Sequence, residues 1–195
     1  MPFPRKAAAM RVVSLSLAAA AVLLGSGVQA ASTYTKIDYA DCETLETYED
    51  GGAELRCPGL DGLDVFVSEG DARLDVDYGQ KGENFETFSA FNTIGETVEW
   101  LSDARGVPQA AILRYFISVD GREAQALVIS RINTEAQDGC VIGVVDARLE
   151  QANGMARGIG AMAPTFDCSI DPVVIAPGAS ELVLGFNGAN QPPSD

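Results

Sequence analysis

The sequence predicts an α+β domain: an antiparallel β-sheet built as a meander of hairpins, with one C-terminal helix packed on it and two disulfide bonds. Three observations predict this fold. Apolar and polar residues alternate through much of residues 63–145, turn residues rich in glycine separate these segments, and helical spacing of apolar residues appears after Asp146. The composition agrees, because 47% hydrophobic and 21% charged residues are typical of a folded domain and not of a disordered chain.

The first thirty residues are expected to be a signal peptide and not part of the fold. Three basic residues come first, an apolar run covers residues 12–24, and small residues at 28–30 precede an expected cut after Ala30. The alternative, a transmembrane anchor, needs about 20 apolar residues, whereas this run is shorter and includes two serines. We therefore expect a periplasmic or secreted protein with no membrane span after cleavage.

The charge balance restricts the partners. The chain has 28 Asp and Glu against 13 Lys and Arg, no histidine, and a formal net charge of −15. Because the leader contains basic residues and no acidic ones, its removal makes the protein more acidic still. This argues against binding of nucleic acid or anionic lipid, both of which need a basic surface. A basic protein or peptide fits as a partner; alternatively, the acidity only keeps an exported protein in solution.

Four cysteines, Cys42, Cys57, Cys140 and Cys168, follow the leader. An even number in an oxidising compartment predicts two disulfide bonds. Of the three possible connectivities we expect Cys42–Cys57 and Cys140–Cys168, because each pair lies within one local unit. A metal or redox-active site is disfavoured, since the chain has no C-x-x-C spacing and no histidine.

The first half of the domain is expected to be β-structure. Residues 33–39 are predicted to be extended, residues 42–57 to form a hairpin that turns at 49–52, and residues 63–78 to form a second hairpin that turns at 69–71.

In the second hairpin Asp75 and Asp77 alternate with apolar residues, so we expect them on the solvent-exposed face. Residues 79–92 show little periodicity and are interpreted as a long loop held by its phenylalanines.

Residues 94–146 are expected to form the centre of the sheet. A strand near residues 98–100 is followed by strands over 110–119, 124–132 and 140–145. The sequences Asp120-Gly121 and Asp138-Gly139 are turn signals between them. Short turns between consecutive strands predict an antiparallel meander. In the strand over 110–119 one face is wholly apolar, and Ile112 and Phe116 on the other face indicate that this face is partly covered too.

The predicted cover is a helix that begins with Asp146 as its N-cap and ends at Pro164. Apolar residues recur at helical spacing from Leu149 to Ala163. Gly154, Gly158 and Gly160 each disfavour a helix by up to about 1 kcal/mol relative to alanine, so close packing on the sheet must compensate. The expected organisation is therefore a signal peptide over 1–30, one domain over 31–168, and an irregular proline-containing tail over 169–195, in which residues 181–186 are a candidate edge strand.

Four segments of the mature chain resemble those of small exported bacterial proteins of unknown function. They are CPG at 57–59, VSEGDAR at 67–73, FNTIGETVEW at 91–100, and the span from CVIGVVDA to FDC at 140–168. The resemblance implies export and paired cysteines. It implies no catalytic residue and no ligand.

The sequence excludes several chemistries. Without histidine, Ser-His-Asp and Cys-His catalysis and histidine-ligated metal sites are closed to the chain. There is no phosphate loop, and the helix glycines do not form a dinucleotide-binding fingerprint, so no cofactor is expected.

Carboxylate pairs such as Glu96 with Glu99, or Asp75 with Asp77, permit acid–base catalysis, but no spacing requires it. The acidic residues around the second hairpin are of the type that binds calcium. No twelve-residue calcium loop is present, so no metal site is expected.

Three residues are candidate binding residues. Arg114 and Arg131 lie among apolar neighbours on adjacent strands, where an arginine either holds an anionic ligand or, as we favour, pairs with an internal carboxylate. Trp100 is either a binding platform or, as we favour, a core residue.

The sequence thus predicts an exported binding or accessory module, with a basic protein or peptide as the candidate partner, and a non-enzymatic role. One alternative is a carboxylate-dependent hydrolase of an envelope polymer, which needs a concave site holding two carboxylates. The other is a purely structural envelope protein.

Overall fold

The computed structural model describes residues 1, 31–49 and 51–188 of the chain. The predicted signal peptide, residue 50 of the first hairpin turn and the end of the predicted tail lie outside the described residues. Within the described part, no helix is long and apolar enough to cross a membrane.

The strands are β1 Ala31–Lys36, β2 Glu43–Thr47, β3 Ala53–Pro58, β4 Asp64–Gly70, β5 Arg73–Gly79, β6 Thr87–Phe88, β7 Phe91–Ile94, β8 Thr97–Ser102, β9 Pro108–Val119, β10 Arg122–Arg131, β11 Cys140–Asp146, β12 Val174–Ile175 and β13 Phe186–Asn187. The helices are α1 Ala152–Gly160 and α2 Glu181–Leu184, with 3-10 turns η1 Tyr39–Asp41 and η2 Ala163–Thr165.

The largest sheet, sheet A, is mixed. Its strand order is β1-β8-β9-β10-β11-β12, and β7 pairs with β9 beyond the end of β8. Strands β8 to β11 are antiparallel neighbours in chain order, so this part is the predicted meander. The rest departs from it, because β1 crosses to β8 and β12 joins β11 in parallel after the chain has passed through α1. A helix crossover between neighbouring strands produces parallel pairing, which short turns alone cannot produce.

Sheet B consists of β2-β3-β4-β5, all antiparallel, and contains both predicted hairpins. A third, two-stranded sheet pairs β6 with β13. In sheet B, apolar and polar residues alternate along the strands, and the apolar ones face sheet A. Among them are Val65, Val67 and Val76, which are at most 3% exposed.

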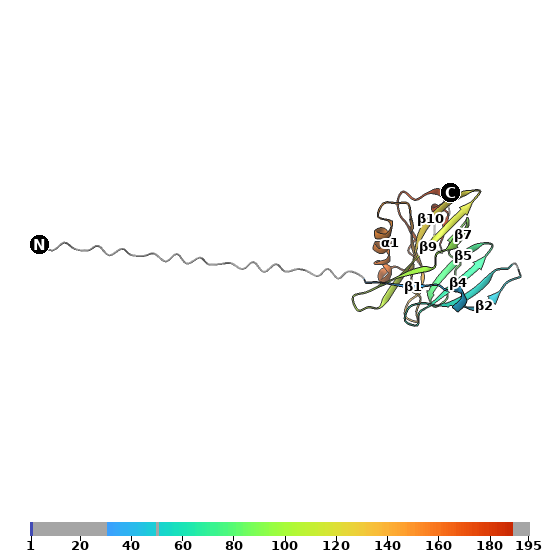
Figure 1. The fold of residues 1–195 in the computed structure, drawn as a ribbon, viewed down its shortest axis with the longest axis horizontal. Coiled ribbons are helices and arrows are strands. Elements are labelled where there is room, and N and C mark those ends of the chain that lie inside the picture. Colours follow the sequence, from blue (N-terminus) through green and yellow to red (C-terminus); the bar gives the residue numbers. More distant parts are fainter. Residues whose placement is uncertain (2–30, 50, 189–195) are drawn as a thin grey trace.

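The domain has three layers, with sheet A in the middle, sheet B on one face and α1 on the other (Figure 1). Between the sheets, the rings of Trp100 and Tyr78 pack nearly perpendicular to each other with centroids 5.5 Å apart, and Tyr115 is 1% exposed. On the helix side, Ile112 and Ile129 pack against Ala156 and their neighbours. The central strands of sheet A are therefore buried on both faces, as their many apolar residues predict.

Helix α1 begins later than predicted. The chain leaves β11 at Asp146 and turns before the helix starts at Ala152, whose N-cap Gln151 has a left-handed φ of 65° and makes no side-chain capping bond. Asp146 is therefore not the helix cap. The helix ends at Gly160, and Pro164 lies in the following 3-10 turn.

The helix glycines differ in their surroundings. A Cβ placed on Gly160 would lie 2.4 Å from Leu101 Cδ1, whereas one on Gly154 or Gly158 would meet nothing within 4 Å. Close packing on the sheet therefore explains Gly160 and does not explain the other two.

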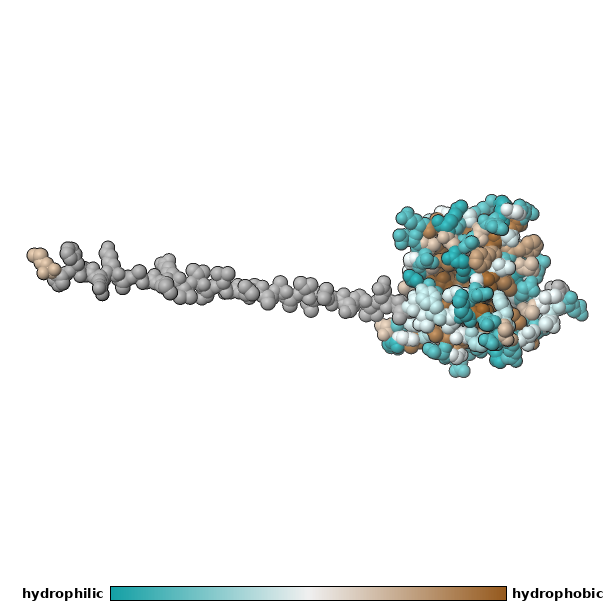
Figure 2. Space-filling model, viewed as in Figure 1, coloured by the Kyte–Doolittle hydropathy of each residue, from teal (hydrophilic) through white to brown (hydrophobic). Residues whose placement is uncertain are grey.

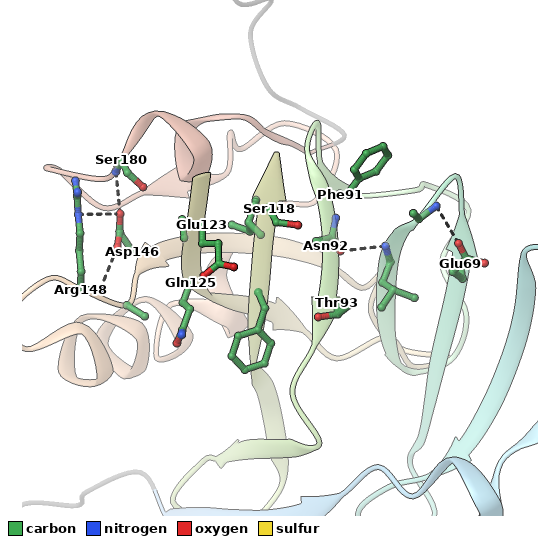
Figure 3. Close-up of a pocket in the computed structure, with 16 residues that line it drawn as sticks. Glu69, Phe91, Asn92, Thr93, Ser118, Glu123, Gln125, Asp146, Arg148 and Ser180 are labelled. Carbon is green, nitrogen blue, oxygen red and sulfur yellow. Dashed lines mark hydrogen bonds and ion pairs between the residues drawn. The ribbon is translucent and has the colours of Figure 1, made fainter. Parts of the chain in front are cut away.

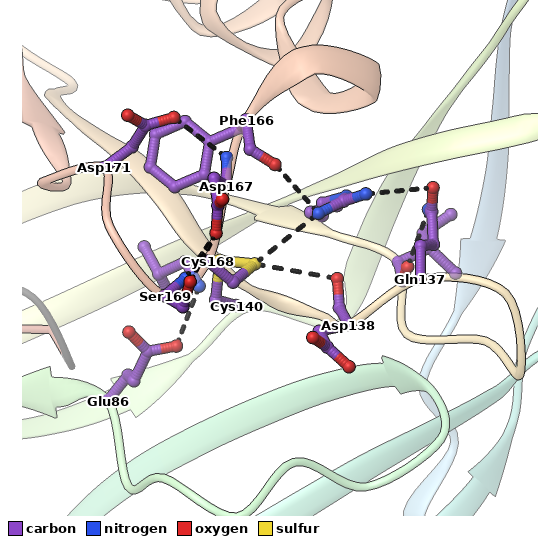
Figure 4. The surroundings of a disulfide bond; sticks show 12 residues. Glu86, Gln137, Asp138, Cys140, Phe166, Asp167, Cys168, Ser169 and Asp171 are labelled. Carbon is purple, nitrogen blue, oxygen red and sulfur yellow. Dashed lines mark hydrogen bonds between the residues drawn. A yellow bond between two sulfur atoms is a disulfide. The ribbon is translucent and has the colours of Figure 1, made fainter.

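Both predicted disulfide bonds are confirmed. Cys42–Cys57 joins the start of β2 to β3, and Cys140–Cys168 joins the start of β11 to the segment after η2 (Figure 4).

Two segments predicted to lack regular structure contain short elements. In residues 79–92, β6 and β7 form, and of the phenylalanines only Phe88 is buried, while Phe85 and Phe91 are 49% and 53% exposed. After Cys168 the chain adds β12, α2 and β13. Residues 181–184 are helical and not an edge strand, and Phe186 packs edge-on against Phe88.

Candidate functional site

A groove of about 920 Å³ crosses sheet A on the face that carries α1. We define it by the strands of its floor, β7, β9 and β10, and by its two end walls (Figure 3). It exists because α1 covers only part of the helix-side face of the sheet. Along β9 on this face, Ile112 is 5% exposed, Arg114 is half-buried and Phe116 is 40% exposed.

The floor of the groove is polar and aromatic. The register places six exposed side chains in two rows across the three strands: Thr93, Phe116 and Gln125 in one row, and Phe91, Ser118 and Glu123 in the other. Residues directly opposite each other on neighbouring strands are about 5 Å apart at Cβ, so each row is continuous. The opposite face of β9 remains in the core, since Leu113, Tyr115 and Ile117 are each 1% exposed.

One end wall is built on Asp146. Its carboxylate accepts hydrogen bonds from the backbone N–H of Ser180 at 2.8 Å and of Arg148 at 3.0 Å, and lies 3.2 Å from Arg148 Nε (Figure 3). Burial by itself raises the pKa of Asp146, but these bonds outweigh it and hold that pKa below its ordinary value. This buried carboxylate fixes the segment before α2 to the end of β11.

The other end wall is the tip of the β4–β5 hairpin. Asp71 and Ala72 both have left-handed φ, 53° and 55°, and Glu69 Oε1 accepts from Ala72 N at 3.0 Å. Asn92 joins this tip to β7, because its N–H donates to Ala72 O at 3.1 Å and its Oδ1 accepts from Leu74 N at 3.0 Å. The sheets are thus held together at the groove.

The groove is negatively charged. Glu69, Glu123 and Asp146 line it, and of the residues that the structure describes along the groove, Arg148, which pairs with Asp146, is the one cation. Among the described residues, neither Glu69 nor Glu123 forms an ion pair. The arrangement therefore offers two carboxylates and two exposed phenylalanines to a ligand.

The three residues proposed from the sequence do not meet in one site. Arg114 lies beside the groove, and its Nη1 donates to Gln125 Oε1 at 3.0 Å, so its partner is an amide and not the expected carboxylate. Trp100 is wholly buried and donates from Nε1 to Thr35 Oγ1 at 2.8 Å, which places it in the core and away from any ligand.

Arg131 lies at the opposite end of β10 from the groove. Its Nη1 donates to the carbonyl of Phe166 at 2.8 Å and its Nη2 to Gln137 Oε1 at 3.3 Å, beside the Cys140–Cys168 bond (Figure 4). These contacts attach η2 to sheet A, so the position of Arg131 indicates a structural role.

The phenylalanines and glutamates of the groove were not identified from the sequence. A usable signal exists: on one face of both long strands the pattern changes from apolar to polar, from Ile112 to Ser118 on β9 and from Ile129 to Glu123 on β10. When the residues on one face of a strand change from apolar to polar midway, the element packed on that face is expected to end there.

A second hollow of about 770 Å³ lies over the outer face of sheet B. It is covered on one side by residues 80–86, which we call the strap. Asp75, predicted to be solvent-exposed, is only 4% exposed, because the strap folds over it; this prediction was wrong. Asp77 is half-buried and accepts a hydrogen bond from Gly82 N at 2.8 Å.

The carboxyl groups around the strap titrate differently from one another. Burial, together with the neighbouring Asp77 and Glu86, holds the pKa of Asp75 well above its ordinary value. Burial also raises the pKa of Asp77, to about 6. The pKa of Glu54 is instead lowered, because it accepts hydrogen bonds from Lys81 and Tyr48. Within the described residues, no group of three or more His, Cys, Asp or Glu side chains is arranged to hold a metal ion.

Comparisons of the chain with protein-family models, with curated proteins and with solved structures found no match. The resemblance to small exported proteins stays a prediction. Any function assigned to this chain therefore rests on its own residues and geometry.

Proposed function

We propose that the protein is an exported binding module whose groove receives an extended basic peptide segment, free or as part of a protein. The observation that carries the proposal is the uncovered half of sheet A, where Phe91 and Phe116 are exposed beside Glu69 and Glu123. A lysine or arginine fits this combination. Its cationic group is attracted by the carboxylates and by the faces of the aromatic rings, and its aliphatic stem packs on them.

The charge of the whole chain supports the same class of partner. A net charge of −15 attracts basic peptides from a distance, and a hollowed surface lined by carboxylates concentrates that attraction locally. In the space-filling view, hydrophilic residues dominate the visible face of the folded part, and apolar patches appear between them (Figure 2).

Binding is tested by calorimetry with a synthetic decapeptide of alternating lysine and serine, at about 20 mM and about 300 mM salt. Electrostatic binding weakens at the higher salt, because the Debye length falls below about 10 Å. Phe116→Ala and Glu123→Gln are expected to weaken binding about 2- to 5-fold each, as losing roughly 0.5–1 kcal/mol of cation–π or charge attraction requires.

The controls carry matched substitutions outside the groove. Phe85 is an exposed phenylalanine, as Phe116 is, and Glu135 an exposed glutamate, and neither lines the groove. Phe85→Ala and Glu135→Gln should bind the peptide like the unmodified protein. Equal losses in groove and control variants would show that the attraction is general to the acidic surface and does not belong to the groove.

Export is part of the proposal. It is supported by the leader pattern and by two disulfide bonds, which persist in oxidising compartments. Mass spectrometry of the protein recovered from a producing cell is expected to find an N-terminus near Ala31, and a mass lower by four hydrogens than that of the reduced chain. Free thiols in the recovered protein would contradict export.

A second candidate function, a carboxylate-dependent hydrolase of an envelope polymer, is favoured by one observation in the second hollow. Glu54 lies opposite Ser68, and Ser68 lies opposite Asp75, so the two acidic residues are two strand spacings or about 10 Å apart. Their pKa values are shifted in opposite directions, as a general acid and a base require. Release of reducing ends from a purified envelope polysaccharide, abolished by both Glu54→Gln and Asp75→Asn in folded protein, would support this function over the first.

A further inference from the structure

The strap is attached to sheet B mainly through carboxyl groups. Lys81 pairs with Glu54, Gly82 N donates to Asp77 Oδ2 at 2.8 Å, and the backbone N–H of Glu86 donates to Asp75. At its far end, the Glu86 side chain accepts a hydrogen bond from Val141 N of β11 at 2.8 Å. The strap thus spans from sheet B to sheet A, and each of these attachments involves an acidic residue.

Three of these acidic residues, Asp75, Asp77 and Glu86, lie close together, and Asp75 and Glu86 are buried. Asp75 is 4% exposed and Glu86 5% exposed; the charges of Asp77 and Glu86 raise the pKa of Asp75, and that of Glu86 also raises the pKa of Asp77. The charged and titratable groups that interact with them are Asp77 on β5, Lys81 and Glu86 on the strap, and the buried hydroxyls of Tyr78 and Tyr115 from β5 and β9. The other charged side chains that line the hollow with Asp75 are Glu54, Glu69, Asp71, Arg73 and Glu83, of which Arg73 pairs with Asp71.

Ionisation of Asp75, Asp77 and Glu86 together places negative charges close to one another with little positive charge to offset them. Lys81 is the cation that acts on Asp77, and it is already paired with Glu54. Like charges that approach each other in a region of low dielectric constant repel strongly, and each ionised carboxylate also loses hydration. Protonation of a carboxylate or the entry of water reduces this repulsion. The strap is the element that keeps water away from Asp75.

We infer that the strap is a pH-dependent cover, which lies closed on sheet B in mildly acidic solution and is released as the solution becomes neutral to alkaline, opening the second hollow. This inference does not depend on what the groove binds. A protein outside the cytoplasmic membrane meets the pH of its surroundings, so such a cover would make access to the hollow respond to that pH.

The direction is set by the carboxyl groups. Asp75 and Asp77 hold protons in the closed form at a pH where an exposed aspartate has lost its own, because their pKa values are raised there. Raising the pH past these values therefore favours the form in which the carboxylates are hydrated. For Asp77 the change is centred near pH 6.

Hydrogen–deuterium exchange tests the inference, with rates corrected for the intrinsic pH dependence of exchange. Between about pH 5 and about pH 8, protection of amides 82–86 is expected to fall at least about tenfold, while amides of β9 and β10 keep theirs. In Asp75→Asn and Asp77→Asn the pH dependence should be reduced or lost, because an amide stays neutral at both pH values.

Glu83→Gln is the matched control, since Glu83 is an exposed carboxylate on the strap itself and should leave the pH dependence unchanged. If Asp75→Asn does not fold, Asp77→Asn decides, because Asp77 is less buried. Equal corrected protection at both pH values in the unmodified protein, or an unaltered pH response in the foldable aspartate variants, would overturn the inference.

Discussion

At the scale of single residues, the clearest departure from local preference is the tip of the β4–β5 hairpin. Asp71 and Ala72 both adopt left-handed φ, which a two-residue hairpin turn requires, and which glycine or asparagine normally supplies. Alanine in this conformation costs about 1 kcal/mol. The contacts of Glu69 and Asn92 with Ala72 hold the tip in place between the groove and the second hollow.

We predict that Ala72→Gly increases the free energy of unfolding by up to about 1 kcal/mol, because glycine adopts this conformation without strain. Urea denaturation followed by circular dichroism measures it. Ala136→Gly is the control: Ala136 is an exposed turn residue whose φ is not left-handed, so glycine should lower stability there. A loss of stability in both variants would contradict the strain at Ala72.

The aspartates show why residue-level prediction from sequence is incomplete. Asp75 alternates with buried residues, and that pattern correctly places it on the outer face of sheet B. The pattern does not indicate the strap, which lies outside the hairpin, covers the outer face of sheet B and buries the side chain of Asp75. The prediction of Asp146 as a helix cap fails for a similar reason. The residue that Asp146 binds, Ser180, lies 34 residues further along the chain, where no local pattern indicates it.

At the scale of elements, local signals predicted most hairpins and strands. Turn residues such as Asp120-Gly121 fix which strands are neighbours, and alternation fixes which face is buried. The start of α1 differs from the prediction because turn residues between Asp146 and Ala152 continue the same apolar spacing, although they are not helical. The short strands β12 and β13 carry two residues each, too few to show a period.

Helix α1 gives a prediction that separates packing from helix propensity. Gly158→Ala is expected to stabilise the protein by up to about 1 kcal/mol, since the site is open and alanine favours the helix. Gly160→Ala is expected to destabilise it, because the new methyl group would overlap buried Leu101. Thermal unfolding of both variants checks this. Stabilisation by both would show that Leu101 yields without cost.

At the scale of the whole molecule, opposite pKa shifts predict how stability depends on pH. The raised pKa values of Asp75 and Asp77 mean that their contribution is full below about pH 4 and is lost as the pH rises through these raised values, about 6 for Asp77. The lowered pKa values of Glu54, Asp103, Asp146 and Asp167 mean that their contribution is present above about pH 4 and is lost below it.

We therefore predict a maximum of the melting temperature near about pH 4, with a decline on both sides. Thermal denaturation between about pH 3 and about pH 8 measures it. In Asp77→Asn the decline on the alkaline side should become shallower, while the acid side is unchanged. A melting temperature that rises steadily from about pH 4 to about pH 8 would contradict the assignment of the buried aspartates.

The sequence by itself determined the antiparallel strands, the apolar faces and the presence of a helix after the sheet. It favoured the cysteine pairing but left three connectivities open, and the structure decided between them. The determined features depend on short-range patterns: alternation, turn residues and helical spacing. Only the tertiary structure decided where α1 ends its cover of sheet A, and where the strap crosses sheet B. The groove and the buried carboxyl groups arise there, because exposure of a side chain depends on which distant segment packs over it.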